Sequence, residues 1–142
     1  MIDYKTNARI NKNGLENLYS SVGWTEYTND LERLEKAINH SLSVITSWHQ
    51  GKLVGLIRVV GDGQTILYIQ DLLVHPDFQN KKIGTQLMDK VLQEYKDVRQ
   101  KILLTEDASN VRRFYEKFGF DSCDKGNLVS FYKEFQLIKI RE

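Results

Sequence analysis

The sequence predicts one mixed α/β (α+β) domain over residues 1–142, with helices on both faces of a central sheet. Some segments place apolar residues at helical spacing, whereas others are runs of β-branched residues, and the two kinds follow one another as β, α, α, β, β, β, α, β, α, β. The chain is long enough to bury a core without disulfides or a structural metal. No Ser-, Gly- or Pro-rich linker and no internal repeat divides it.

The first forty residues predict an edge strand and two amphipathic helices. Residues 2–10 are expected to form a short strand at the edge of the sheet. Apolar side chains then recur at steps of three and four residues over residues 15–24 and again over residues 28–39. The second of these helices is expected to begin at an N-cap formed by Thr28 or Asn29.

The middle of the chain favours strands. Two β-branched runs, residues 42–48 and 53–60, flank a turn and predict an antiparallel hairpin. A second turn at Gly61–Gln64 leads into a third strand over Thr65–Val74. The second half of this strand is almost continuously apolar, which predicts burial on both faces and therefore a central position.

The last part of the chain returns to helical spacing. A helix is predicted over residues 83–95, a short strand over Lys101–Glu106, and a short helix over Asn110–Lys117 that ends at Gly119. Residues 127–140 alternate in polarity and predict one or two final strands.

Charge and cysteine content exclude several classes of protein. The 20 basic and 19 acidic residues leave a net charge of +1, so no overall field holds a polyanion, and nucleic acid is not expected as the partner. A single cysteine, Cys123, cannot form an intramolecular disulfide and fits a reducing cytoplasm. No apolar stretch approaches a membrane span, and no histidine has a second ligand at metal spacing. We therefore expect a cytoplasmic protein without a metal and without a membrane partner.

Residues 72–88 are the most informative stretch, because a buried strand, a tight turn and a helix start follow one another. The free N–H groups and the dipole of a helix's first turn can bind a phosphate without a basic surface. Gly84 allows close approach to the backbone, and Lys81 and Lys82 add positive charge. The alternative is an ordinary strand-to-helix connection with solvated lysines.

Two motifs resemble the GNAT superfamily of acyl-CoA-dependent N-acyltransferases. The family pattern L-x-V-x-P-x-x-[QR]-x-x-G-x-[GA] is matched by Leu72, Val74, Pro76, Gln79 and Gly84. The segment NVRRFYEKFGF, residues 110–120, is similar to a later helix of the family. Lys82 stands in place of the first glycine of the pattern. We expect its N–H to serve the coenzyme only if its φ is negative, because a residue with a side chain is strained in the left-handed region.

The resemblance implies a small bacterial-type acetyltransferase whose sheet is mostly antiparallel and splays at a bulge between the fourth and fifth strands. It implies a single N-acetyltransferase domain that moves an acetyl group from acetyl-CoA directly to a primary amine of a small molecule or peptide. A backbone N–H of Leu73 or Val74 would stabilise the oxyanion. The coenzyme-binding residues implied are Leu72, Leu73, Val74, Gln79, Asn80, Lys81, Lys82, Ile83, Gly84, Thr85, Asn110 and Tyr115.

The resemblance also implies catalytic roles. Tyr115 matches the tyrosine that gives a proton to the leaving thiolate; the alternative is a tyrosine that only packs in the core. Asp71 and Glu26 are the carboxylates proposed as general base, acting through a water. Asp71 could equally be the structural partner of a lysine, and Glu26 a plain loop residue. Asn110 either contacts the coenzyme or caps its helix.

Other interpretations stay open. Trp24, Glu26 and Tyr27 would wall an acceptor site for a cationic or aromatic amine, or they plug the core between helices. The loss of glycine at Lys82 favours a non-catalytic acyl-CoA-binding or regulatory module as a second hypothesis. A structural or dimerisation protein is the third, and the apolar C-terminal strands would suit a homodimer by analogy with the fold.

Overall fold

The computed structural model describes residues 1–135. The chain divides into two compact units, Met1–Leu104 and Thr105–Glu142, and each is described by itself. The single-domain organisation stays a prediction. No helix in the described part of the chain is long and apolar enough to cross a membrane.

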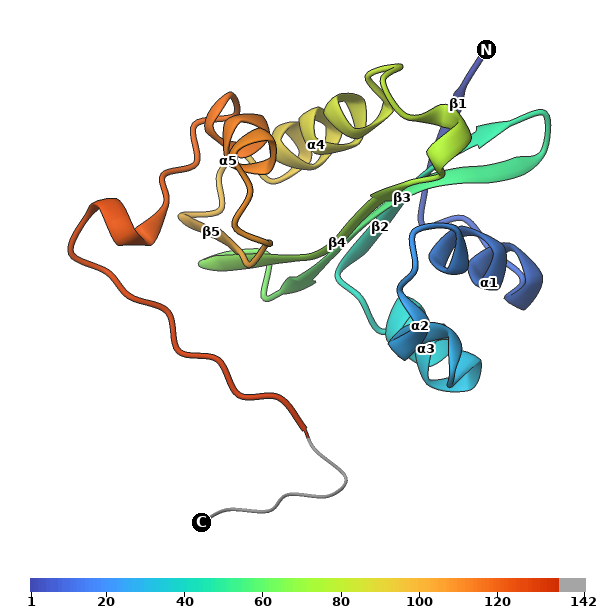
Figure 1. Ribbon diagram of the computed structural model, residues 1–142, viewed down its shortest axis with the longest axis horizontal. Helices are drawn as coiled ribbons and strands as arrows, with labels where there is room; N and C mark the ends of the chain where they lie inside the picture. Colours follow the sequence, from blue (N-terminus) through green and yellow to red (C-terminus); the bar gives the residue numbers. More distant parts are fainter. Residues whose placement is uncertain (136–142) are drawn as a thin grey trace. The chain divides into compact units, whose positions relative to one another are not determined.

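The first unit holds one five-stranded sheet whose strands lie in sequence order (Figure 1). Strands β1 to β4 pair antiparallel, whereas β4 and β5 pair parallel. The predicted mixed, mostly antiparallel sheet is therefore confirmed, with β1 as the edge strand expected at the N-terminus. The strands are β1 (Asp3–Thr6), β2 (Ser43–His49), β3 (Lys52–Gly61), β4 (Ile66–Val74) and β5 (Gln100–Leu103).

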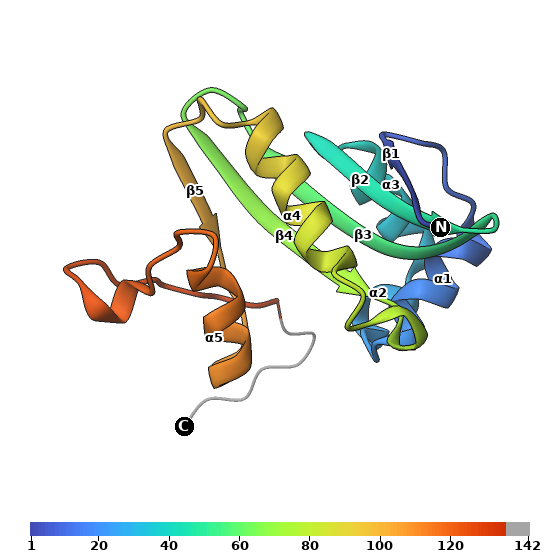
Figure 2. The same cartoon turned by 90° about the horizontal axis from the view of Figure 1, so that it is seen from above.

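Helices cover both faces of this sheet, as predicted (Figure 2). On one face lie α1 (Lys12–Ser21), α2 (Thr25–Thr28) and α3 (Leu31–Asn39), and on the other lies α4 (Ile83–Glu94). The predicted N-cap of the second amphipathic helix was wrong. Thr28 belongs to the separate short helix α2, and the side chain of Asp30 accepts a hydrogen bond from the N–H of Arg33 at the start of α3.

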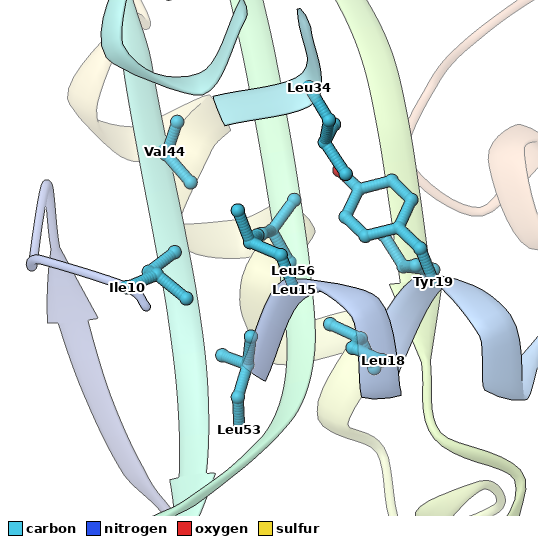
Figure 3. Close-up of a cluster of buried hydrophobic side chains, with 9 residues drawn as sticks. Ile10, Leu15, Leu18, Tyr19, Leu34, Val44, Leu53 and Leu56 are labelled. Carbon is cyan, nitrogen blue, oxygen red and sulfur yellow. The ribbon is translucent and has the colours of Figure 1, made fainter. Parts of the chain in front are cut away.

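The core under α1 and α3 is built from aliphatic side chains and one tyrosine (Figure 3). Burying side chains of this size contributes about 1.5–3 kcal/mol each relative to exposure. The members are Ile10, Leu15, Leu18, Tyr19, Leu34, Val44, Leu53, Leu56 and Leu73.

On the opposite face, α4 packs on β2, β3 and β4 through its apolar stripe. Gly55 of β3 allows this approach, because a Cβ there would lie 3.1 Å from Ile83 and 3.3 Å from Leu87. The helix that begins at Ile83 is thereby fixed against the strands whose ends build the site.

Strand β4 lies between β3 and β5, so its predicted central position is confirmed. The prediction of burial on both faces is confirmed only in part. Leu67, Ile69, Asp71 and Leu73 are buried, and the residues between them are exposed or half-buried.

The second unit contains the short helix α5 (Ser109–Glu116), followed by Gly119 at a φ of 88° and a 3-10 turn over Cys123–Lys125. The predicted final strands are not formed over residues 127–135, which have no strand partner within the described chain. Alternating polarity marks a segment able to pair, but pairing itself needs a neighbouring strand. The rest of that prediction, residues 136–140, lies outside the described residues.

Candidate active site

Strand β4 separates from β5 halfway along its length. Pairing runs from Ile66 with Gln100 to Ile69 with Leu103 and stops there. Residues 70–74 continue beside β3, so one edge of their backbone carries no strand. This is the splay that the family resemblance implied.

A bulge accompanies the separation. The register between β3 and β4 passes from Val59 opposite Ile69 to Arg58 opposite Asp71, so Gln70 is the extra residue. A bulge bends the strand and increases its twist, and it reverses the faces to which the following side chains point. Asp71 and Leu73 consequently point toward α1, as their contacts with Tyr19 and the core cluster show.

The ladder with β3 determines which amides face the open edge. The N–H of His75 donates to the carbonyl of Val54 at 2.8 Å. Hydrogen-bonded and non-hydrogen-bonded pairs alternate in an antiparallel ladder, so the N–H of Leu73 is directed toward β3. The N–H groups of Leu72 and Val74 are directed away from it, toward the uncovered edge.

The turn after β4 returns to the same edge. Pro76–Phe78 form a 3-10 turn, and the side-chain amide of Gln79 donates to the carbonyl of Val74 at 3.0 Å. The imidazole of His75 accepts the N–H of Asp77 at 3.1 Å, which makes it a turn residue. Gln79 therefore occupies one carbonyl of the free edge and ties the turn to the strand.

Lys82 adopts the left-handed conformation, with φ 63° and ψ 21°, and Asn80 has φ 64°. Lys82 therefore does not meet the condition, a negative φ, under which its N–H was expected to serve the coenzyme. The backbone follows the path that a glycine at this motif position takes most easily, and the lysine accepts roughly 1–2 kcal/mol of strain to keep it. The shape of the turn thus survives the substitution of the glycine.

Helix α4 begins directly after Lys82. In the part of the chain that the structure describes, no side chain caps this end, and the N–H of Gln86 is the one bonded to the carbonyl of Lys82, at 3.0 Å. The N–H groups of Ile83, Gly84 and Thr85 precede that bond and have no intrahelical partner. With the exposed Lys81 and Lys82, they form the arrangement predicted for an anion site.

Asp71 lies at the centre of a buried polar network on the other side of β4. Its side chain is 2% exposed, and its Oδ2 accepts hydrogen bonds from Arg58 Nε at 2.7 Å and from the hydroxyl of Tyr19 at 3.0 Å. Its Oδ1 accepts from the hydroxyl of Tyr27 at 2.7 Å. The structural partner of Asp71 is thus Arg58 and not a lysine.

The network keeps its phenols neutral. Burial, followed by the charge of Asp71, raises the pKa of Tyr19 and of Tyr27 above the ordinary value of a phenol. Burial alone would lower the pKa of Arg58, but the neighbouring carboxylate outweighs it and the net shift is upward. Both tyrosines therefore remain hydrogen-bond donors to the Asp71 carboxylate.

Sequence reasoning missed Arg58, Tyr19 and Tyr27 as members of this network. Arg58 carried a signal, because it is a lone charge within the otherwise apolar run of residues 53–60. A charge in such a strand needs a buried partner. Tyr19 carried none, since its spacing fits an ordinary core position.

In the segment around Glu26, one side chain packs against the core and another is exposed at the surface. Trp24 packs against the core cluster and lies edge-on to Tyr19, with ring centroids 6.0 Å apart. This favours the core-plug alternative for Trp24. Glu26 is exposed in the first turn of α2, next to Tyr27.

An open polar depression lies beside this end of β4. Its lining comes from the outer face of α1, with one carboxylate, and from His75 directly after the strand. The lining residues are Asn13, Glu16, Asn17, Ser20, Ser21 and His75. Among the described residues, no group of three or more metal-ligating side chains occurs.

Helix α5 in the second unit carries Asn110 and Tyr115. The N-cap is Ala108, so the alternative in which Asn110 caps the helix was wrong. Tyr115 is half-buried and packs edge-on against Phe114 and Phe120. Burial raises the pKa of Tyr115, and a hydrogen bond with Thr105 opposes that shift.

Comparison with known proteins identifies related chains. A family described as Acetyltransferase (GNAT) domain matches residues 8–133. An uncharacterized ycf52-like N-acetyltransferase of Prochlorococcus marinus is 32% identical over 123 residues, which are 83% of this chain and 67% of that protein.

Solved structures share the fold. A GNAT-family acetyltransferase from Streptococcus pneumoniae TIGR4 is 34% identical and superposes with a TM-score of 0.80, over 94% of this chain and 100% of its own. AAC(6')-Iy, solved with a bisubstrate analogue that contains CoA, has a TM-score of 0.66 over 95% of this chain and 99% of its own. At 15% identity, the second likeness concerns the fold alone.

The Arg58–Asp71 pair predicts a large loss of stability in Asp71→Asn. The substitution leaves the buried guanidinium without its counter-charge, and we expect the free energy of unfolding to fall by about 3–5 kcal/mol. Urea denaturation measures it. Asp30→Asn is the matched control, because Asp30 pairs with Arg33 at the surface and asparagine also caps a helix. Equal losses in the two variants would contradict a buried, energetically coupled pair.

The strain at Lys82 predicts opposite effects for two neighbouring substitutions. Lys82→Gly relieves the left-handed conformation and should raise the free energy of unfolding by about 0.5–1 kcal/mol. Lys81→Gly removes the same charge at a residue without positive φ and should lower it by about the same amount. Urea denaturation of both variants measures their free energies of unfolding. A stabilised Lys81→Gly would show that charge, not backbone strain, is the cause.

Proposed function

Since the chain belongs to the GNAT acetyltransferase family, we propose that it transfers an acetyl group from acetyl-CoA directly to a primary amine of a small molecule or peptide. The family membership supports acetyl transfer. The choice of acetyl-CoA and of the amine, and the residue roles below, are the proposal.

The observation that carries this proposal is the free edge of β4 between the bulge and the turn. Amides of Leu72 and Val74 are directed there, where the pantetheine arm can pair with the strand as an extra strand would. Of the two oxyanion donors expected from the sequence, Val74 fits this geometry and Leu73 does not, because the N–H of Leu73 is directed toward β3.

The turn and the start of α4 are proposed to hold the diphosphate of the coenzyme. The first-turn amides of α4 follow the free edge directly along the chain, at Ile83, Gly84 and Thr85. Backbone amides and the helix dipole attract an anion locally, and Lys81 and Lys82 add charge. Gln79 and Asn80 shape the turn, and Asn110 is proposed as a further coenzyme contact by resemblance.

The reaction needs one proton removed from nitrogen and one supplied to sulfur. The neutral amine attacks the thioester carbonyl carbon, a C–N bond forms, and the oxyanion accepts the N–H of Val74. The C–S bond then breaks, and we assign the proton taken up by the thiolate to the hydroxyl of Tyr115. The raised pKa of Tyr115 keeps that hydroxyl protonated at neutral pH.

Glu26 is the carboxylate that we propose as the base, acting through a water. It is exposed and next to Tyr27 on α2. Asp71, the other candidate, is 2% exposed and already accepts from Arg58, Tyr19 and Tyr27. Removing a proton from the amine would require breaking that network, so we assign Asp71 a supporting role.

Titration calorimetry with acetyl-CoA, followed by a panel of amines monitored for free thiol, tests the proposal. Binding together with thiol release for at least one amine is the expected result. Binding without release across a broad panel would favour the non-catalytic acyl-CoA-binding module instead. An absence of acetyl-CoA binding would overturn both.

Tyr115→Phe should separate turnover from binding. Loss of the proton donor is expected to lower kcat by about 10²–10⁴-fold. The dissociation constant for acetyl-CoA should change by less than about 2-fold, because a neutral phenol contributes little to binding the anionic coenzyme. Steady-state kinetics with an amine from the panel gives the first value and calorimetry the second. Phe114→Leu, on the same helix, controls for loss of aromatic packing; an unchanged kcat in Tyr115→Phe would remove the assignment.

A further inference from the structure

The hydroxyl of Tyr27 contacts the β4 bulge at two consecutive residues. It donates to Asp71 Oδ1 at 2.7 Å and accepts from the side-chain amide of Gln70 at 3.2 Å. Gln70 is the extra residue of the bulge, and Asp71 is the first residue after it. One phenol therefore bridges the point at which β4 leaves β5.

The partners of this hydroxyl are themselves held in place. Arg58 Nη2 lies 3.4 Å from the Tyr27 hydroxyl, and Arg58 Nε bonds to the Asp71 carboxylate at 2.7 Å. Arg58 also reaches the hydroxyl of Ser41 at 3.4 Å. The bulge is thus fixed from β3 by a charge and from α2 by a phenol.

The helix that carries Tyr27 packs against α1 and α3. Helix α2 is a single turn of four residues, and its N-cap makes no side-chain hydrogen bond. The ring of Tyr27 lies 5.0 Å from the ring of Tyr19 and 6.2 Å from that of Trp24. The aromatic contacts place the ring, and the hydroxyl links α2 to the two bulge residues.

We propose that Tyr27 is a positioning residue for coenzyme binding: its hydroxyl holds the bulge at Gln70 and Asp71, so that the edge at Leu72–Val74 keeps the orientation that receives acetyl-CoA. The inference rests on the proposed function, because it assigns acetyl-CoA to that edge. Tyr27 acts through the strand and touches neither the coenzyme nor the reacting atoms.

Tyr19 provides a matched control within the same network. Its hydroxyl bonds to the same carboxylate at 3.0 Å, but through Oδ2, and it has no bond with the bulge residue Gln70. Tyr19 is also the more deeply buried of the two. Replacing either tyrosine by phenylalanine removes one hydroxyl and retains the ring, so a purely structural role predicts at least as large an effect at position 19.

Calorimetric titration of the full chain with acetyl-CoA tests the inference. We expect Tyr27→Phe to weaken acetyl-CoA binding by about 3- to 10-fold, the range for one lost hydrogen bond. Tyr19→Phe should change it by less than about 2-fold while lowering the melting temperature at least as much as Tyr27→Phe. Equal affinities of Tyr27→Phe and the unsubstituted protein would overturn the inference while leaving the proposed function intact. Failure of the unsubstituted protein to bind acetyl-CoA would overturn the proposed function.

Gln70→Ala supplies an independent variant, because Gln70 is exposed and its loss does not threaten folding. It should weaken acetyl-CoA binding in the same direction as Tyr27→Phe. The double variant should weaken acetyl-CoA binding by less than the two single variants would together if they acted independently, since both break the same bridge. Full additivity would show that Tyr27 and Gln70 act separately and would contradict the bridge.

Discussion

The ion pair between Arg58 and Asp71 is the interaction on which the described part of the site depends, because it joins β3 to β4 directly beside the bulge. Taking two charges out of water costs several kcal/mol per ion unless each finds good partners. Here Asp71 accepts from two phenols besides the guanidinium, and those phenols come from α1 and α2. The charge of one carboxylate therefore organises two strands and two helices at the point where the sheet opens.

Under the proposed function, a nearly neutral chain would bind a highly charged coenzyme through the opened edge and the start of α4. A net charge of +1 provides no attraction over the whole surface. Backbone amides at Val74 and at the first turn of α4 would provide it locally, over distances where screening by salt is weak. Composition describes the surface as a whole, and it has no bearing on a site built from main-chain groups.

The sequence predicted the elements well where hydrophobic spacing was regular, as in α4 and in the β2–β3 hairpin. It also predicted the turn after β4 through Pro76 and Gly84. It could not predict the partners of Asp71, because Tyr19 and Arg58 lie 52 and 13 residues away in the chain and meet only in the fold. The final strands are not formed over the described residues 127–135 for a related reason: alternation of polarity describes one strand, whereas a ladder needs two.

The substitution at Lys82 shows which property of the motif matters. Glycine at that position has no side chain and also tolerates a positive φ, and sequence comparison alone does not separate the two properties. Lys82 keeps the positive φ at an energetic cost while adding a side chain. The path of the backbone into α4 is therefore what the turn preserves, because that path directs the free amides outward. A lysine can occupy the position since its long side chain leaves the backbone toward solvent, where Lys82 is exposed.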